Sequence, residues 1–313
     1  MSRSEATLEH LLQLLPGIEE LEVLRLRLIA AAVPDPGKTW DSSSSYSTID
    51  KRILTPESVE QSLDAAENAL REYVAMLHDG LRPAFRSYFA GDTESAARHL
   101  LSLGEHHEMA GRARGAEQSY KTALALSLPL PDKSLQIFAL RRLGRVALSL
   151  AQYPDATSYY ERSAELARDS QDLRAEVAAR TGAGNVRMYQ GRWADGERMY
   201  QEALTLAQSA GTPGETLELG QLYNNLGNAT TRIGRLAEAE EWLQRALRVW
   251  TEVSSPADQA VCLMNVGHLR EAQDRLSETH EAYESALALP IPPAFKSLAA
   301  ADLAEVYLKE GFV

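Results

Sequence analysis

The chain has 313 residues, 44% of them hydrophobic, and a formal net charge of −12. This length and composition can bury a substantial core in two compact domains or one elongated one, whereas the acidity disfavours a general nucleic-acid-binding protein. The sequence contains no apolar run long enough to span a membrane, and its single cysteine, Cys262, cannot form an internal disulfide, which favours a cytoplasmic protein.

Residues 1–92 are predicted to form a small helical region that packs on the rest of the chain. Helices are expected over 4–15, over 18–33, from Thr55 with Pro56 in its first turn, and over 81–90. Residues 34–50 are rich in serine and are typical of a loop. A degenerate extra repeat in this region is the alternative interpretation.

Residues 93–313 are predicted to form a repeat array with a period near forty residues. Five glycines follow hydrophobic residues at steps of 40, 40, 43 and 40: Gly104, Gly144, Gly184, Gly227 and Gly267. Mostly small residues recur seven, twelve and nineteen places after each glycine. Large residues stand sixteen places after it, namely Tyr120, Tyr160, Tyr200, Leu243 and Tyr283. The pattern predicts stacked pairs of antiparallel helices, because one pair cannot bury its own apolar stripe.

The repeats are expected to start near 97, 137, 177, 220 and 260, with second helices beginning near 113, 153, 193, 236 and 276. The small residues should let the two helices of a pair approach closely, and the large residue should fill the space between one pair and the next. A partial sixth repeat or capping helix begins at about 297. Its Leu303, Tyr307 and Phe312 have no second helix to cover them, so we expect them to pack back as a cap or to meet another chain.

The spacing of Leu103-Gly104, Gly111, Ala116, Tyr120 and Ala123, with its four counterparts, resembles the tetratricopeptide repeat family over about 97–290. The resemblance implies an all-α, right-handed superhelical solenoid of five repeats plus a partial sixth. The observed period exceeds the family's usual period of about 34 residues. Long repeats of this kind look like those of kinesin light chains and Rap-type bacterial regulators.

Three motifs that suggest chemistry are better explained by structure. Gly37-Lys38-Thr39 resembles the end of a phosphate-binding loop, but the preceding segment is predicted as a helix, not a strand. His106-His107 lies among glutamates, and adjacent residues of a helix point in different directions, so a solvated polar face is expected instead of a metal site. Cys262 lies between apolar residues and is expected to be a buried structural thiol. We therefore expect a non-enzymatic protein without cofactor or metal.

The first helices of such arrays line the concave surface, and their polar places predict the binding site. In repeat four, the six places that share one helical face are all polar: Gln221, Asn224, Asn225, Asn228, Thr231 and Arg232. An asparagine amide offers both a donor and an acceptor, so a row of asparagines can hold an extended peptide backbone. The predicted peptide-binding residues are Arg141, Arg142, Arg145, Asn185, Asn225, Asn228, Arg232 and Asn265.

The charges of the first helices favour an acidic ligand. In repeats two to five these helices are expected to hold seven arginines against Glu271, an excess of six positive charges in a chain of −12. A basic groove in an acidic body attracts an acidic peptide. Arg180, Arg187 and Arg270 lie outside the strict groove places and are expected to pair with carboxylates of the second helices, and scattered solubility charges are the alternative interpretation. The family's clamp for chaperone C-termini is matched at Asn185 and Asn225, but Thr181 replaces its lysine.

These features predict a cytoplasmic adaptor, scaffold or regulator that binds a protein partner through an extended, acidic peptide, without nucleic acid or membrane. Two alternatives remain: a self-assembling structural module that oligomerises through its C-terminal repeat, for instance as a homodimer through the C-terminal helix, and a Rap-type peptide sensor whose N-terminal helices bind an effector. For the asparagines there is also a structural alternative, in which their amides bond across neighbouring helices and stabilise the array.

Overall fold

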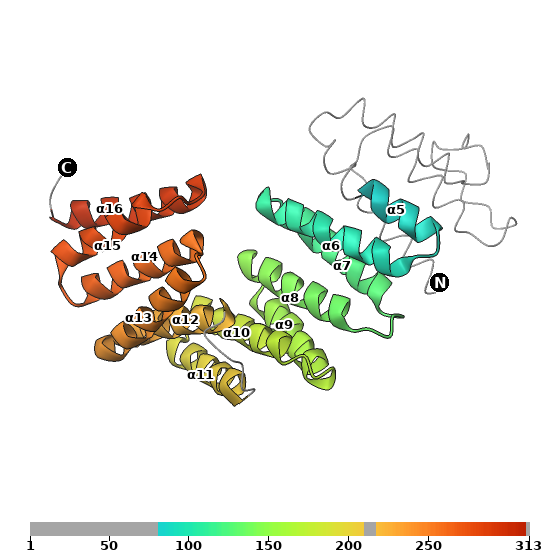
Figure 1. Cartoon of the computed structure of the whole chain (residues 1–313), viewed down its shortest axis with the longest axis horizontal. Coiled ribbons are helices and arrows are strands. Elements are labelled where there is room, and N and C mark those ends of the chain that lie inside the picture. The colour runs from blue at the N-terminus through green and yellow to red at the C-terminus, as the bar shows by residue number, and fades with distance from the viewer. Residues whose placement is uncertain (1–80, 210–216, 311–313) are drawn as a thin grey trace, which may run out of the picture. The chain divides into compact units, whose positions relative to one another are not determined.

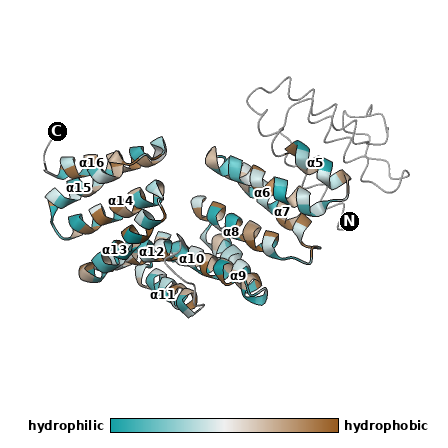
Figure 2. Cartoon of the chain, in the orientation of Figure 1, coloured by the Kyte–Doolittle hydropathy of each residue, from teal (hydrophilic) through white to brown (hydrophobic). Residues whose placement is uncertain are grey.

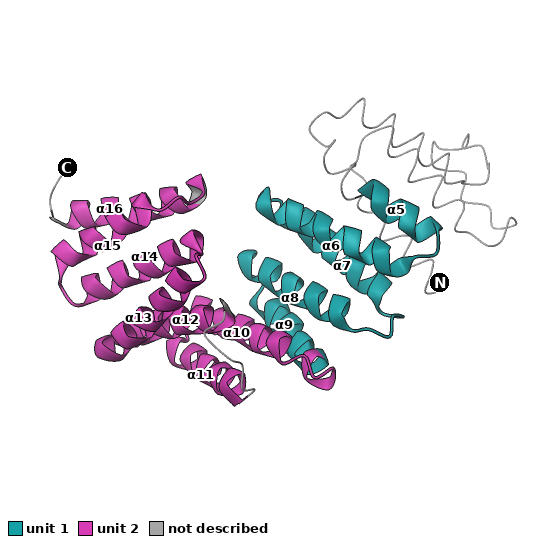
Figure 3. Ribbon diagram, viewed as in Figure 1, with its two compact units in different colours: residues 1–166 teal, residues 167–313 magenta. Residues whose placement is uncertain are grey.

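The computed structural model describes residues 81–209 and 217–310, in which every regular element is an α-helix (Figure 1). The chain divides into two compact units, residues 1–166 and 167–313 (Figure 3). The helices expected over 4–15, over 18–33 and from Thr55, and the loop expected over 34–50, lie outside the described residues. The proposed boundary between 92 and 93 stays a prediction.

Unit 1 is built around α6, which packs against helices on both sides of it along the chain. Its helices are α5 (Arg82–Phe89), α6 (Thr93–Met109), α7 (Ala113–Ser127) and α8 (Ser134–Ser149), and α9 (Tyr153–Asp169) runs across the boundary between the units. Helix α6 contacts α5, α7 and α8. Phe85, Leu100 and Tyr120 are almost fully buried in its core. The short helix expected over 81–90 is confirmed as α5.

Unit 2 repeats one packing pattern along its length. Its helices are α10 (Leu173–Tyr189), α11 (Trp193–Ser209), α12 (Leu217–Ile233), α13 (Leu236–Glu252), α14 (Pro256–Ala272), α15 (Leu276–Ala288) and α16 (Pro293–Glu310). Each helix packs against the next, and α10, α12, α14 and α16 also contact one another in that order. Hydrophobic and hydrophilic residues are interspersed along these helices (Figure 2).

The second helix of each pair begins at the predicted residue, whereas each first helix begins three or four residues earlier than predicted. For α6 and α10 the early starts reflect N-caps that the apolar pattern does not reveal. The side chain of Asp92 accepts a hydrogen bond from the Ser95 amide at 2.9 Å, and that of Asp172 accepts one from the Ala175 amide at 3.1 Å. Aspartate at this place satisfies an amide that has no partner within the helix.

The repeated glycine and the large residue sixteen places later form one contact within each pair. A Cβ atom on Gly104 would lie 2.3 Å from the ring of Tyr120, and one on Gly184 would lie 2.5 Å from that of Tyr200. The large residue therefore packs directly on the glycine of its own pair, whereas the spacing predicted that it fills the space between pairs. The prediction that these residues belong to the core is confirmed, since all five are at least 96% buried.

The small residue seven places after this glycine has a different role from the one predicted. Gly111 ends α6 with φ of +70°, and a Cβ atom added to it would meet no other atom within 4 Å, so close helix approach does not explain it. Its amide donates to the Glu108 carbonyl, and the Arg112 amide donates to the His107 carbonyl. This pair of bonds is a Schellman helix end, which needs the left-handed conformation that glycine favours. Ala151 takes the same place with φ of +57°.

The last helix packs back on unit 2. Val306 and Ala299 of α16 are buried, and Leu303 packs against the same core as α14 and α15. The Tyr307 ring lies 4.7 Å from the ring of His280 in α15. The predicted packing is thus present for Leu303 and Tyr307, while Phe312 lies outside the described residues. In residues 81–209 and 217–310, no helix is long and apolar enough to cross a membrane.

Candidate functional site

Four predicted asparagines lie on neighbouring first helices of unit 2, and we call them the asparagine row. Asn185 belongs to α10, Asn225 and Asn228 to α12, and Asn265 to α14. Helix α12 contacts both α10 and α14. All four side chains are half-buried. The repeat spacing therefore brings these residues to one surface of unit 2, as the sequence predicts for adjacent first helices.

Two amide–amide hydrogen bonds link the first helices. Asn225 donates through Nδ2 to Oδ1 of Asn185 at 3.3 Å, and the Tyr200 hydroxyl donates to the same oxygen at 2.6 Å. Asn265 donates through Nδ2 to Oδ1 of Asn224 at 2.9 Å. Asn224, which the sequence placed on the binding face, is only 9% exposed. The structural alternative for the asparagines thus holds for these two pairs.

The row retains hydrogen-bonding groups that these bonds do not use. Oδ1 of Asn185 and Nδ2 of Asn225 and Asn265 are engaged, which leaves Nδ2 of Asn185 and Oδ1 of Asn225 and Asn265 without a hydrogen bond to any described residue. The Asn228 side chain makes no hydrogen bond within the part of the chain that the structure describes. Because these side chains are half-exposed, both donors and acceptors are available to a ligand.

Arg232 places a positive charge beside the row. It follows Asn228 by one turn of α12, and its guanidinium lies 5.7 Å from the ring centroid of Trp193. Its side chain is exposed, and no carboxylate among the described residues pairs with it. Its charge lowers the pKa of His268 on α14, although burial of that imidazole is the larger cause. Arg232 can therefore pair with an anion from outside the chain.

In unit 1 two of the three predicted arginines, Arg142 and Arg145, pair with carboxylates that the sequence prediction did not consider. Arg145 donates to both oxygens of Glu108 at 2.9 and 2.6 Å, and Arg142 forms an ion pair with Glu105. The Tyr120 hydroxyl also donates to Glu108 at 2.6 Å, and burial with this neighbour raises the pKa of Tyr120. The glutamates come from α6, whose charges the prediction left out. They offset much of the positive charge that these two arginines bring.

The remaining charges further reduce the predicted excess. The earlier helix starts add Arg174 but also Glu176, Glu218 and Asp258, so the excess on α8, α10, α12 and α14 is four, not six. Arg270 pairs with carboxylates of α13 and α15, at 2.7 Å from Glu240 and 3.2 Å from Glu278, as predicted. The prediction was wrong for Arg180, which pairs with Glu176 of its own helix at 2.8 Å, and for Arg187, which bonds to Gln190.

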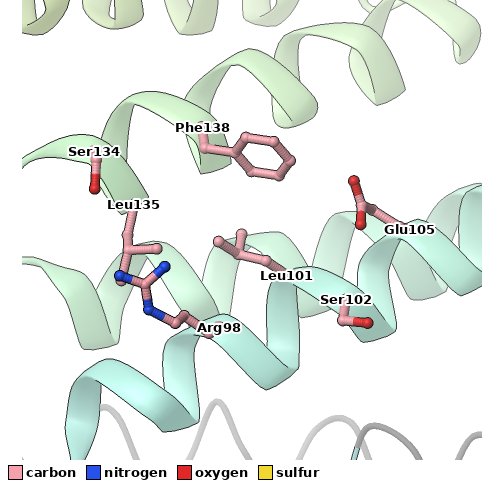
Figure 4. Close-up of a pocket in the computed structure, with 7 residues that line it drawn as sticks. All are labelled: Arg98, Leu101, Ser102, Glu105, Ser134, Leu135 and Phe138. Carbon is pink, nitrogen blue, oxygen red and sulfur yellow. The ribbon is translucent and has the colours of Figure 1, made fainter.

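Sequence reasoning missed a pocket of about 370 Å³ between α6 and α8 of unit 1 (Figure 4). Its lining residues are Arg98, Leu101, Ser102, Glu105, Ser134, Leu135 and Phe138. The ring of Phe138 points from α8 into the space between the two helices. Phe138 lies six residues before Gly144, as Gln221 lies six residues before Gly227 in repeat four, so comparing equivalent positions between repeats would have singled it out.

Two of the three motifs set aside on sequence grounds lie in the described residues, whereas Gly37-Lys38-Thr39 lies outside them. Cys262 is fully buried, and burial raises the pKa of its thiol to about 12. His106 is exposed, whereas His107 is half-buried against Gly115 of α7, so the expected solvated face is correct for His106 only. Thr181, which stands where the clamp has lysine, is buried and donates to the Val177 carbonyl at 2.8 Å, so its side chain is not available to bind a ligand. Among the described residues, no three His, Cys, Asp or Glu side chains are grouped to hold a metal.

Comparisons with known proteins agree with this architecture. The tetratricopeptide repeat model matches residues 95–169 and 218–290. No curated protein matches the chain in sequence. BtubC from P. vanneervenii, at 18% identity, aligns over 72% of this chain and 89% of its own, with a TM-score of 0.54.

Two further solved structures have a similar likeness. A Rap protein complexed with Competence and Sporulation Factor is 13% identical, with 82% of this chain and 75% of that chain covered and a TM-score of 0.53. Aspartyl phosphate phosphatase F from Bacillus subtilis is 13% identical, with 81% and 71% covered and a TM-score of 0.53. At such identities the likeness concerns the fold alone. The chain thus contains tetratricopeptide repeats, a protein-interaction fold, and its structural neighbours are kinesin light chain-like and Rap proteins.

Proposed function

We propose that the chain is a non-enzymatic adaptor or regulator that captures an extended peptide of a partner protein on the first helices of unit 2. The observation that carries the proposal is the asparagine row. Asn185 and Asn225 are held by their mutual bond and by Tyr200, and Asn265 is held by Asn224, yet Asn228 and one end of each of these three amides remain available. Side chains that are fixed in this way lose little conformational freedom when a ligand binds.

The composition of the asparagine row suits recognition of a peptide's backbone better than recognition of one particular side chain. A peptide group exposes one N–H and one C=O, and an asparagine amide complements both. Donors and acceptors spaced along α10, α12 and α14 can therefore hold an extended chain whatever its sequence. The Rap neighbour, which its structure describes as complexed with Competence and Sporulation Factor, supports this kind of function without identifying the ligand of this chain.

We further propose that the peptide is acidic next to its site on α12. Arg232 supports this, because its exposed guanidinium has no carboxylate partner among the described residues. Arg142 and Arg145 give no support, since they belong to unit 1 and Glu105 and Glu108 already pair with them. The proposed preference for acidic peptides therefore depends on Arg232 alone, whereas the sequence predicts a groove lined by several arginines.

Peptides selected from a random phage-displayed dodecamer library against the full chain test the proposal. Asn228→Ala should raise the Kd of a selected peptide by about fivefold or more, because two backbone hydrogen bonds are lost. Gln208→Ala is the matched control, since it removes an exposed amide from the second helix α11. Equal affinities for the two variants and the wild type would show that the row is not the site.

The acidic preference needs its own pair of variants. Arg232→Glu should weaken acidic peptides strongly, and added salt should weaken their binding to the wild type. Arg248→Glu makes the same charge change at an exposed position on the second helix α13 and should leave the affinity nearly unchanged. If both variants lose affinity to the same degree, net charge and not Arg232 determines the preference.

Self-association through α16 is a second candidate, supported by its exposed side chains. Leu298 is 53% exposed and Leu308 is 65% exposed. Exposed apolar residues on one helix are a feature of protein interfaces. Light scattering over a range of concentrations should then detect a homodimer that Leu298→Glu with Leu308→Glu abolishes, and a monomer at every concentration would remove this candidate.

A further inference from the structure

His268 stands at the place in α14 that asparagine holds in the two preceding first helices. It follows the repeat glycine of its helix by one place, as Asn185 does on α10 and Asn228 does on α12. Helix α12 contacts α14, and 36% of the His268 side chain is exposed. Equivalent places of adjacent repeats lie side by side in a stacked array. A peptide that follows the asparagine row would therefore meet an imidazole on α14 in place of an amide.

Two neighbours hold the imidazole in place. Nε2 of His268 lies 3.5 Å from Oδ2 of Asp302 on α16, and the imidazole lies edge-on to the Tyr283 ring on α15, with 5.9 Å between the ring centroids. Apart from Asp302, the His268 side chain has no polar partner in residues 81–209 and 217–310. Because both nitrogens of an imidazole can form hydrogen bonds, His268 has capacity left for a group of a ligand.

The surroundings of His268 keep its imidazole neutral. Burial is the largest effect and lowers the pKa of His268. The charges around it come from three helices: Arg232 of α12, Glu271 of α14, and Asp302, Glu305 and Lys309 of α16. Arg232 lowers the pKa of His268 further, and the three carboxylates raise it. Lys309 pairs with Glu271 at 2.5 Å and with Glu305 at 2.9 Å. These neighbours hold three negative charges against two positive ones, so protonation of His268 removes the local excess of negative charge.

We propose that His268 is a further residue of the peptide site, and that it takes up a proton when a carboxylate of an acidic peptide binds between it and Arg232. This inference rests on the proposed capture of a peptide and deepens it, because it makes the capture depend on pH. A carboxylate beside an imidazole favours the charged imidazolium, so the bound peptide raises the pKa of His268. By linkage, the peptide then binds more tightly as the pH falls through the pKa of His268 in the complex, and the gain levels off below the pKa in the free chain.

The test measures the Kd of a library-selected acidic dodecamer without histidine, by fluorescence polarisation, at about pH 8 and about pH 6, where histidine titrates and carboxylates stay ionised. A nearby opposite charge shifts a pKa by about 1–3 units, so the wild type should bind at least about threefold more tightly at the lower pH. His268→Asn restores the asparagine of the equivalent places and cannot take up a proton. Its Kd should match that of the wild type at the higher pH and differ by less than about twofold between the two conditions.

Two further variants make the comparison specific. His106→Gln removes an exposed histidine from α6 of unit 1 and should keep the pH dependence of the wild type. His268→Gln repeats the test if circular dichroism shows that His268→Asn does not fold. The NMR signal of the His268 Cε1–H group, titrated with acid in the free and the peptide-saturated chain, should report a higher pKa in the complex.

An equal pKa of His268 in the two states, or a pH dependence that persists in His268→Asn, overturns the proposal. Selected peptides without any acidic residue overturn it as well, because they supply no carboxylate. If Asn228→Ala weakens binding while the affinity of the wild type is the same at both pH values, the peptide-capture function stands and the proton uptake fails. If the library yields no peptide that binds the wild type, both fail.

Discussion

Asn185→Ala and Asn228→Ala are the same change at equivalent places of two repeats, yet we expect them to shift stability in opposite directions. Oδ1 of Asn185 accepts hydrogen bonds from Tyr200 at 2.6 Å and Asn225 at 3.3 Å. Each bond contributes about 0.5–1.5 kcal/mol net, and alanine recovers about 0.5 kcal/mol of helix propensity. Asn185→Ala should therefore lower the free energy of unfolding by about 0.5–2.5 kcal/mol.

Asn228 has no hydrogen bond to lose within the described residues. Only the propensity gain remains, so Asn228→Ala should raise the free energy of unfolding by up to about 0.5 kcal/mol. The protein would then be slightly more stable and bind peptide less well, which is the pattern expected where a residue is kept for a site.

Urea titrations followed by circular dichroism measure both variants beside the wild type. Repeat arrays can unfold in steps, so the slopes of the transitions must agree before the midpoints are converted to free energies. If Asn185→Ala is as stable as Asn228→Ala, the bonds to Asn185 do not stabilise unit 2 and the reasoning fails. A loss of about 1 kcal/mol or more for Asn228→Ala, the net contribution of one hydrogen bond, would show that it too is structural.

The packing leads to three more predictions. Gly104→Ala should destabilise the chain by about 1–3 kcal/mol, because the new Cβ would lie 2.3 Å from the Tyr120 ring, and a thermal melt unchanged from the wild type would refute that contact. Ala151→Gly should raise the melting temperature slightly by relieving a φ of +57°, a strain of about 1–2 kcal/mol that the added chain entropy only partly offsets; a lower value would contradict this. Cys262, with its thiol pKa raised to about 12, should react with a disulfide reagent at pH 8 (about the usual thiol pKa) only after unfolding, and rapid labelling of the native chain would disprove its burial.

The repeat pattern in the sequence was sufficient to predict the helix pairs and the residues of their core. The starts of the second helices and the burial of the tyrosines follow from spacing alone, because a stacked array allows few other arrangements. The structural role of Gly111 could not be predicted in this way, since a glycine is compatible both with the close approach of two helices and with a left-handed φ. Only the backbone distinguishes these two roles.

The chemistry of the candidate site was harder to predict than its position. Periodicity placed Asn224 and Asn225 on one polar face, but it does not say which amide turns toward a neighbouring helix. The predicted charge excess also included Arg145 without its partner Glu108, which is 37 residues earlier in the sequence. Pairing between repeats is a matter of side-chain geometry, and a helical period carries no information about it.

The central claim is that the free amide groups of the asparagine row bind a peptide backbone, and their NMR signals test it most directly. The side-chain NH₂ signals of Asn185, Asn225, Asn228 and Asn265 can be assigned with single Asn→Ala variants and followed as a library-selected dodecamer is added to the chain. The amide protons of Asn185 and Asn228 have no acceptor among the described residues. Their signals should therefore shift as peptide is added, and the titration curve should give the same Kd as fluorescence polarisation. A peptide that binds with the same Kd and leaves all four signals unmoved would contradict it.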